Sequence, residues 1–139
     1  MPTAPSRHEG LTDTKQGRLA IIVVVAGTIL VVAAFANVLG NNAADAEANS
    51  VRAALREELG ELPDDQALVL PPKEGGPIDD AVGRVLRRHP GELVAVGRPE
   101  HRRMTVVAVE TGWTWWPRCV RAELRGDHTV LTRVSNGTC

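Results

Sequence analysis

Aromatic side chains are scarce in this sequence, which has no tyrosine, one phenylalanine and three tryptophans in 139 residues. The tryptophans lie together, at Trp113, Trp115 and Trp116. A strand through them would place Trp113 and Trp115 on one face and Trp116 on the other, with Pro117 forcing an edge or a bulge. Three interpretations stay open. One or two rings could anchor a core without other aromatics, the cluster could form a binding surface, or it could contact the outer membrane interface, where tryptophan accumulates.

Recognisable catalytic and cofactor-binding motifs are also missing. The sequence contains no G-x-S-x-G, H-E-x-x-H or P-loop pattern, and no nucleophile and base at a recognised spacing. We therefore expect no cofactor, no bound metal and a binding or accessory role. A small envelope hydrolase remains an alternative, because catalytic groups can meet in space without a motif.

The sequence also lacks the strong positive charge of a general nucleic-acid binder, since its net charge is −1. Residues 41–80 carry ten acidic and three basic side chains, whereas residues 81–139 carry ten arginines and five acidic side chains. Either the two parts fold onto each other and neutralise their charge, or the second part presents a face to an anionic or protein partner in the envelope. The densest basic region consists of Arg84, Arg87, Arg88, His89, Arg98, His101, Arg102 and Arg103. Together with the three tryptophans, Arg98, Arg102 and Arg103 form our candidate binding surface.

One long hydrophobic run, Leu19–Leu39, contains 21 residues and no charge. A helix of this length spans about 30 Å, the thickness of the hydrocarbon core of a bilayer. We therefore predict a single transmembrane helix in contact with lipid. Lys15 and Arg18 precede the run and only acidic charges follow it closely, so the positive-inside rule places residues 1–18 in the cytoplasm and residues 41–139 outside.

A cleaved secretory signal is the alternative to a retained anchor. Ala34-Phe35-Ala36 matches a signal-peptidase site, and cleavage there would release a secreted protein. The apolar run exceeds the roughly 7–15 residues typical of a signal, so we favour the anchor. Both alternatives deliver the domain to the same side of the membrane.

The two cysteines of the chain, Cys119 and Cys139, both lie in the predicted exported part. An even pair outside the cytoplasm favours a disulfide. It would close a loop of about 20 residues and contribute roughly 3 kcal/mol in the chain-entropy model.

Two helices are expected in the exported domain. Ala43–Gly60 carries an apolar stripe formed by Ala48, Val51, Leu55 and Leu59. It either continues the membrane helix or is separated from it by a break at Gly40-Asn41-Asn42. A second helix, with Ile78, Val82, Val85 and Leu86 on its inner face, should be capped by Asp79 or Asp80 and extend to His89.

The remaining pattern predicts strands. Gln66–Leu70 is a short candidate, and four longer segments are valine-rich or alternate between apolar and polar residues: Glu92–Val96, Met104–Glu110, Trp115–Arg125 and Thr129–Val134. The last two should form a hairpin around Gly126-Asp127. We therefore predict an α+β fold: one transmembrane helix, then two helices and an antiparallel sheet of about four strands, closed by the disulfide.

The layout resembles that of type IV pilin-like proteins, which have a short basic leader ending in glycine, a long apolar helix that enters the head domain, an antiparallel sheet and a C-terminal disulfide loop. The similar features here are Lys15-Gln16-Gly17, the apolar run, the strands and the cysteine pair. Ile22 stands where the pilin pattern has glutamate. The resemblance implies a structural subunit of a surface assembly. The main hypothesis is a single-pass, membrane-anchored binding or accessory protein of a bacterial cell envelope.

Overall fold

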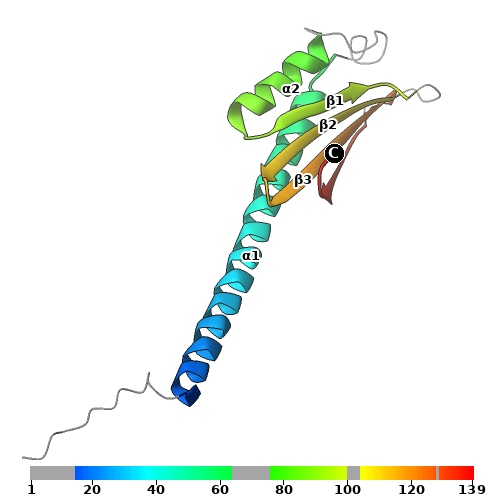
Figure 1. Cartoon of the computed structure of the whole chain (residues 1–139). Coiled ribbons are helices and arrows are strands. Elements are labelled where there is room, and N and C mark those ends of the chain that lie inside the picture. The colour runs from blue at the N-terminus through cyan, green and yellow to red at the C-terminus, as the bar shows by residue number, and fades with distance from the viewer. Residues whose placement is uncertain (1–14, 64–75, 100–103, 128) are drawn as a thin grey trace, which may run out of the picture. The chain divides into compact units, whose positions relative to one another are not determined.

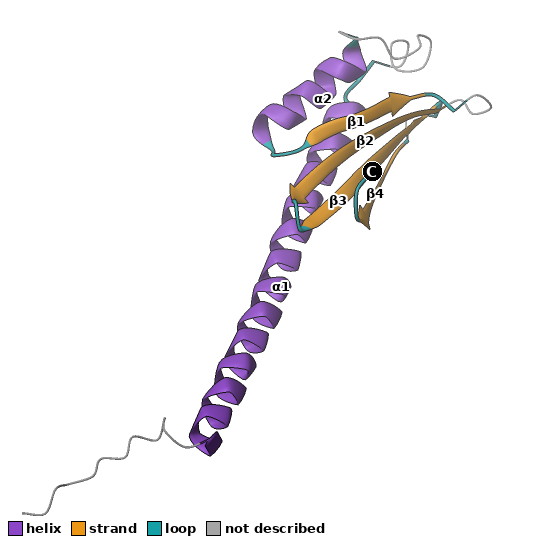
Figure 2. Cartoon of the chain, viewed as in Figure 1, coloured by secondary structure: helices purple, strands orange, loops and turns teal. Residues whose placement is uncertain are grey.

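The computed structural model describes residues 15–63, 76–99, 104–127 and 129–139 (Figure 1). In these ranges the elements are α1 (Lys15–Gly60), α2 (Pro77–Arg88), β1 (Glu92–Gly97), β2 (Met104–Trp113), β3 (Trp116–Arg125) and β4 (Val130–Asn136). This confirms the predicted α+β class (Figure 2). The predicted strand at Gln66–Leu70 lies outside the described residues.

The chain divides into two units, Met1–Val38 and Leu39–Cys139. The described part of the first unit is an exposed apolar helix, long and hydrophobic enough to cross a membrane. Its Thr28 hydroxyl donates to the Val24 carbonyl at 2.9 Å, which satisfies this polar group within the helix.

No helix break occurs at Gly40-Asn41-Asn42, because α1 is helical from Lys15 to Gly60. The alternative of a break there is therefore wrong. Within this helix the side-chain oxygen of Asn41 accepts a hydrogen bond from the Arg118 guanidinium at 2.9 Å.

In the second unit both helices supply apolar side chains to one core. The predicted stripe of α1 is confirmed, because Ala48, Val51, Leu55 and Leu59 are all buried. The inner face of α2 is also confirmed, with Ile78, Val82 and Val85 buried and Leu86 packed against them. The sheet contributes Val107, Val109, Val120, Ala122, Leu124 and Val130.

The start of α2 differs from the prediction. Gly76 is the N-cap and Pro77 opens the helix, whereas Asp79 and Asp80 lie in the first turn. Proline suits this place because the first helical N–H groups have no partner within the helix. The two carboxylates instead face the positive end of the helix dipole.

The four strands form an antiparallel sheet in the order β1-β2-β3-β4. Val109 pairs with Val120 and Val107 with Ala122, so the buried positions of β2 and β3 share one face. The predicted hairpin between β3 and β4 is confirmed. In its turn, the Asp127 carboxylate accepts the Thr129 backbone N–H at 3.1 Å, which lowers the pKa of Asp127.

The structure contains the Cys119–Cys139 disulfide, with the two Cα atoms 4.9 Å apart. Backbone contacts also hold the C-terminal segment. The Gly137 N–H donates to the Pro117 carbonyl at 2.9 Å, and the Cys139 N–H donates to the Glu110 carboxylate at 3.3 Å. The last residues are therefore attached to both β3 and β2.

Candidate functional site

The three tryptophans lie on a tight hairpin, and the expectation of one strand through all of them is wrong. Trp113 ends β2, Thr114 and Trp115 form the turn, and Trp116 begins β3. Trp113 and Trp116 are paired residues whose ring centroids are 6.4 Å apart. The sequence has no Asn-Gly or Asp-Gly pair here, so the local pattern did not predict this turn.

Gly112 and Pro117 accommodate the start of this hairpin. The two residues are paired, and Gly112 has φ = +92°. A Cβ atom at position 112 would lie 2.5 Å from the Trp116 carbonyl oxygen, so only glycine fits. Pro117 is the second residue of β3, close to the strand start where proline is tolerated. The pairing of β2 with β3 continues without a shift through Pro117, so the predicted bulge is absent. Pro117 has no partner residue in β4, so it lies at an edge on that side, as the alternative prediction has it.

The tryptophans have different environments. Trp113 and Trp115 are 64% and 83% exposed, so neither anchors the core. Trp116 is half-buried beside α1, where a Cβ atom at Gly40 would lie 2.6–2.7 Å from three of its ring carbons. Trp116 is thus the partly buried member of the three, and it packs on Gly40 of α1 outside the core cluster.

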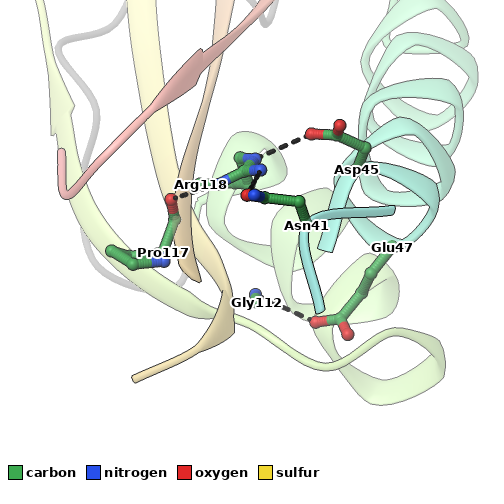
Figure 3. A network of polar contacts seen from close by, with 6 residues as sticks. All are labelled: Asn41, Asp45, Glu47, Gly112, Pro117 and Arg118. Carbon is green, nitrogen blue, oxygen red and sulfur yellow. Dashed lines mark hydrogen bonds and ion pairs between the residues drawn. The ribbon is translucent and has the colours of Figure 1, made fainter. Parts of the chain in front are cut away.

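Arg118 forms a buried polar contact between β3 and α1 that the sequence reasoning missed (Figure 3). Its side chain is only 6% exposed. The guanidinium donates to the Asp45 carboxylate at 2.7 Å, to the Asn41 side-chain oxygen at 2.9 Å and to the Pro117 carbonyl at 3.2 Å. A buried arginine requires such partners. The only sequence signal was its place in the inward alternation of β3.

Glu47 makes a second contact between α1 and β2 (Figure 3). Its Oε1 atom accepts the Gly112 N–H at 3.0 Å and lies 2.6 Å from the Thr111 hydroxyl. That hydroxyl is also 2.9 Å from the Pro90 carbonyl, and with one hydrogen it donates to one acceptor at a time. Glu47 thus fastens the end of β2 that leads into the tryptophan turn.

The basic side chains of α2 pair with the acidic first part of the domain. Glu58 contacts Arg84 at 2.7 Å and Arg88 at 3.2 Å, and its side chain is 12% exposed. The hydrogen bond from Arg84 is the main cause that lowers the pKa of Glu58. With the Arg118–Asp45 pair, these contacts favour neutralisation between the two halves.

The rest of the predicted basic surface is only partly described. Arg98 is half-buried, and His101, Arg102 and Arg103 lie outside the described residues. That part of the candidate binding surface therefore stays a prediction.

One serine and one histidine meet although they are 39 residues apart. The Ser50 hydroxyl lies 2.7 Å from Nδ1 of His89. His89 follows α2, and its backbone N–H donates to the Val85 carbonyl at 2.9 Å. The contact therefore joins the end of α2 to α1.

The surface hollows of the second unit include two that are lined entirely by described residues. The first, about 460 Å³, is lined by Arg52, Ala53, Arg56, Glu57 and Thr132. The second, about 320 Å³, lies beside the tryptophan turn and is lined by Glu110, Thr111, Gly112, Trp113, Thr114, Pro117 and Thr138. Among the described residues, no group of three or more histidine, cysteine or acidic side chains is placed to hold a metal ion.

Comparison with known proteins found no matching family model, no matching curated protein and no matching solved structure. The chain's own geometry is therefore the basis for the functional proposal.

Proposed function

We propose that this chain is a single-pass, membrane-anchored protein whose second unit works outside the cytoplasm as a binding or accessory domain of the cell envelope. Leu19–Leu39 is the anchor in contact with lipid. Lys15 and Arg18 hold the N-terminal side in the cytoplasm, because cytoplasmic flanks carry the excess of cations. The disulfide supports the same orientation, since disulfides persist in oxidising compartments.

The observation that carries this proposal is that polar contacts join β3 to α1 directly after the apolar run. Asn41 and Asp45, which hold Arg118, lie two and six residues beyond Leu39. The rise of an α-helix is about 1.5 Å per residue, so both contacts fall within about 10 Å of Leu39 along the helix. The second unit is therefore a juxtamembrane domain without an intervening linker, suited to a partner at the membrane surface.

The first hollow is the surface we assign to that partner. Arg52 and Arg56 are exposed, lie four residues apart on one face of α1, and make no ion pair among the described residues. Two such guanidinium groups can bind carboxylate or phosphate groups in a bidentate manner. Thr132 of β4 adds a hydroxyl group to the lining. We propose an acidic protein segment or another anionic envelope component as the ligand.

Site-specific photo-crosslinking tests this function. A photoreactive residue replaces Ala53 in the hollow or, as the matched control, the exposed Ala95 of β1. Irradiation of the source cells should give a discrete adduct only from position 53, and Arg52→Ser with Arg56→Ser should reduce its yield at least fivefold. Equal labelling patterns from both positions, or an adduct indifferent to the arginines, would contradict the proposal.

A structural subunit of a surface assembly is the second candidate, because the layout noted in the sequence has a structural counterpart. One helix carries the apolar run and then packs the antiparallel sheet, and a disulfide closes the C-terminal end. Recovery of the chain in high-mass fibres, with its N-terminus processed after Gly17, would favour the assembly. An unprocessed chain in the membrane fraction would favour the binding domain.

A further inference from the structure

We propose that Trp113 and Trp115 enter the interfacial layer of the membrane, so that the β2–β3 turn is a second lipid contact of the domain. This inference rests on the proposed anchoring of Leu19–Leu39. It assigns the exposed tryptophans to a lipid surface, whereas the first hollow, with Arg52 and Arg56, is assigned to the partner.

The level of the turn along α1 is the first argument. Leu39 is both the last residue of the apolar run and the first residue of the second unit. Trp116 packs on Gly40, the next residue, whereas Arg118 reaches Asn41 and Asp45. From Arg118 to Trp116, β3 therefore runs toward the Leu39 end of the unit.

The turn continues in that direction. Thr114 and Trp115 form the turn between β2 and β3. Figure 1 shows these two strands joined at one end of the sheet. A Cβ atom at Gly112, which pairs with Pro117, would lie 3.6 Å from the Cβ atom of Ala44. A strand advances about 3.3 Å per residue, so the tip of the turn approaches the level of Gly40. The turn therefore lies at the Leu39 end of the second unit, where the apolar run of the sequence gives way to polar residues.

The chemistry of the turn is the second argument. Residues 111–117 read Thr-Gly-Trp-Thr-Trp-Trp-Pro and carry no charge. Trp113 and Trp115 expose most of their surface, in a chain with one other aromatic residue besides the tryptophans. Indole has an apolar body and one N–H donor, so it is most stable between the headgroups and the acyl chains. The turn carries no charge that would have to be desolvated on entering this layer, so its composition is compatible with it.

Depth-dependent fluorescence quenching tests the inference. The full chain is reconstituted into phosphatidylcholine vesicles whose acyl chains carry bromine either near the carbonyl group or near the terminal methyl. We expect shallow bromine to reduce tryptophan emission about twofold and deep bromine to reduce it much less. Trp113→Ser with Trp115→Ser should remove most of this quenching, leaving the contribution of Trp116.

Controls separate this inference from the anchoring on which it rests. Vesicle flotation reports the anchor, and the double variant should still float because its apolar run is intact. A chain that floats but shows no bromine quenching, with its tryptophans open to aqueous iodide, would overturn the lipid contact and leave the anchor standing. A chain that does not float would overturn both. If the double variant is unstable, Trp115→Ser alone gives the readout, because this ring lies in the turn and is the most exposed of the three.

Discussion

Replacing Gly40 by alanine should destabilise the domain, although the same change normally stabilises a helix. Glycine in a helix interior costs about 1 kcal/mol relative to alanine. At position 40, however, the added methyl group would lie 2.6–2.7 Å from the Trp116 ring, well inside van der Waals contact. Overpacking of this kind costs about 1–3 kcal/mol. Taking a clash of about 2 kcal/mol against the gain of about 1, we expect the free energy of unfolding to fall by about 1 kcal/mol.

Gly83→Ala in α2 is the matched control. The nearest atom to its added methyl group would be a terminal nitrogen of Arg87, 3.5 Å away, which is ordinary contact. This variant should therefore raise the free energy of unfolding by about 1 kcal/mol. Urea unfolding of the full chain in detergent micelles, followed by far-ultraviolet circular dichroism, compares the two variants.

A double-mutant cycle identifies the cause. With Trp116→Ala present, the clash is gone and Gly40→Ala should stabilise the domain, giving a coupling energy of about 2 kcal/mol. The reasoning is refuted if Gly40→Ala stabilises the original chain as much as Gly83→Ala does, or if its effect is the same with and without the tryptophan.

Three further predictions concern the contacts that hold the domain together. Replacing Cys119 and Cys139 by serine should lower the free energy of unfolding by about 3 kcal/mol, measured by urea unfolding; a change below 1 kcal/mol contradicts this. Asp45→Ala should cost about 1–2 kcal/mol because it leaves the buried Arg118 guanidinium without its carboxylate, and Arg118→Leu added to it should recover part of the loss; a double variant less stable than Asp45→Ala would oppose this account. The pKa of Glu58 is lowered in the folded state, chiefly by the hydrogen bond from Arg84. The ionised carboxylate therefore contributes to the free energy of unfolding at pH values above its unfolded pKa, and this contribution is lost as the pH falls through its folded pKa. The melting temperature of Glu58→Gln should therefore decline less than that of the original chain on acidification, and parallel declines would count against the ion pairs.

Hydrophobic periodicity was sufficient to predict the helices and most of the sheet. The α1 stripe repeats at three and four residues and the β3 pattern alternates, so both burial patterns are readable along the chain. The β3–β4 hairpin contains Gly126-Asp127, which marks a turn by composition. Helix periodicity, strand alternation and turn composition depend on residues close together in the chain, so they can be predicted from the sequence.

The tryptophan turn and the buried polar contacts were not predictable in the same way. The turn depends on Gly112 with positive φ and on its pairing with Pro117, neither of which a β-propensity pattern contains. Arg118 and Asp45 are 73 residues apart, so their pairing follows from the packing of β3 on α1. The position of an arginine in an alternating strand does not predict which carboxylate it pairs with.

The candidate site was predictable in residue type more than in arrangement. The three tryptophans were recognisable by their clustering, but their division into one packed ring and two exposed rings depends on Gly40. The first hollow was not predictable from charge density, because Arg52 and Arg56 lie in an acidic stretch and outside the dense basic segments. Their spacing of four residues on the exposed face of a predicted helix was the available signal.

The most direct test of the central claim is the intact mass of the protein extracted from its native membrane, alkylated with and without prior reduction. A membrane-anchored chain with an exported domain should retain Leu19–Leu39 in the measured mass, and its two cysteines should react only after reduction. A mass that begins after Ala36 would replace the anchored protein with a secreted one. Two thiols that react without reduction would contradict the exported, disulfide-closed domain.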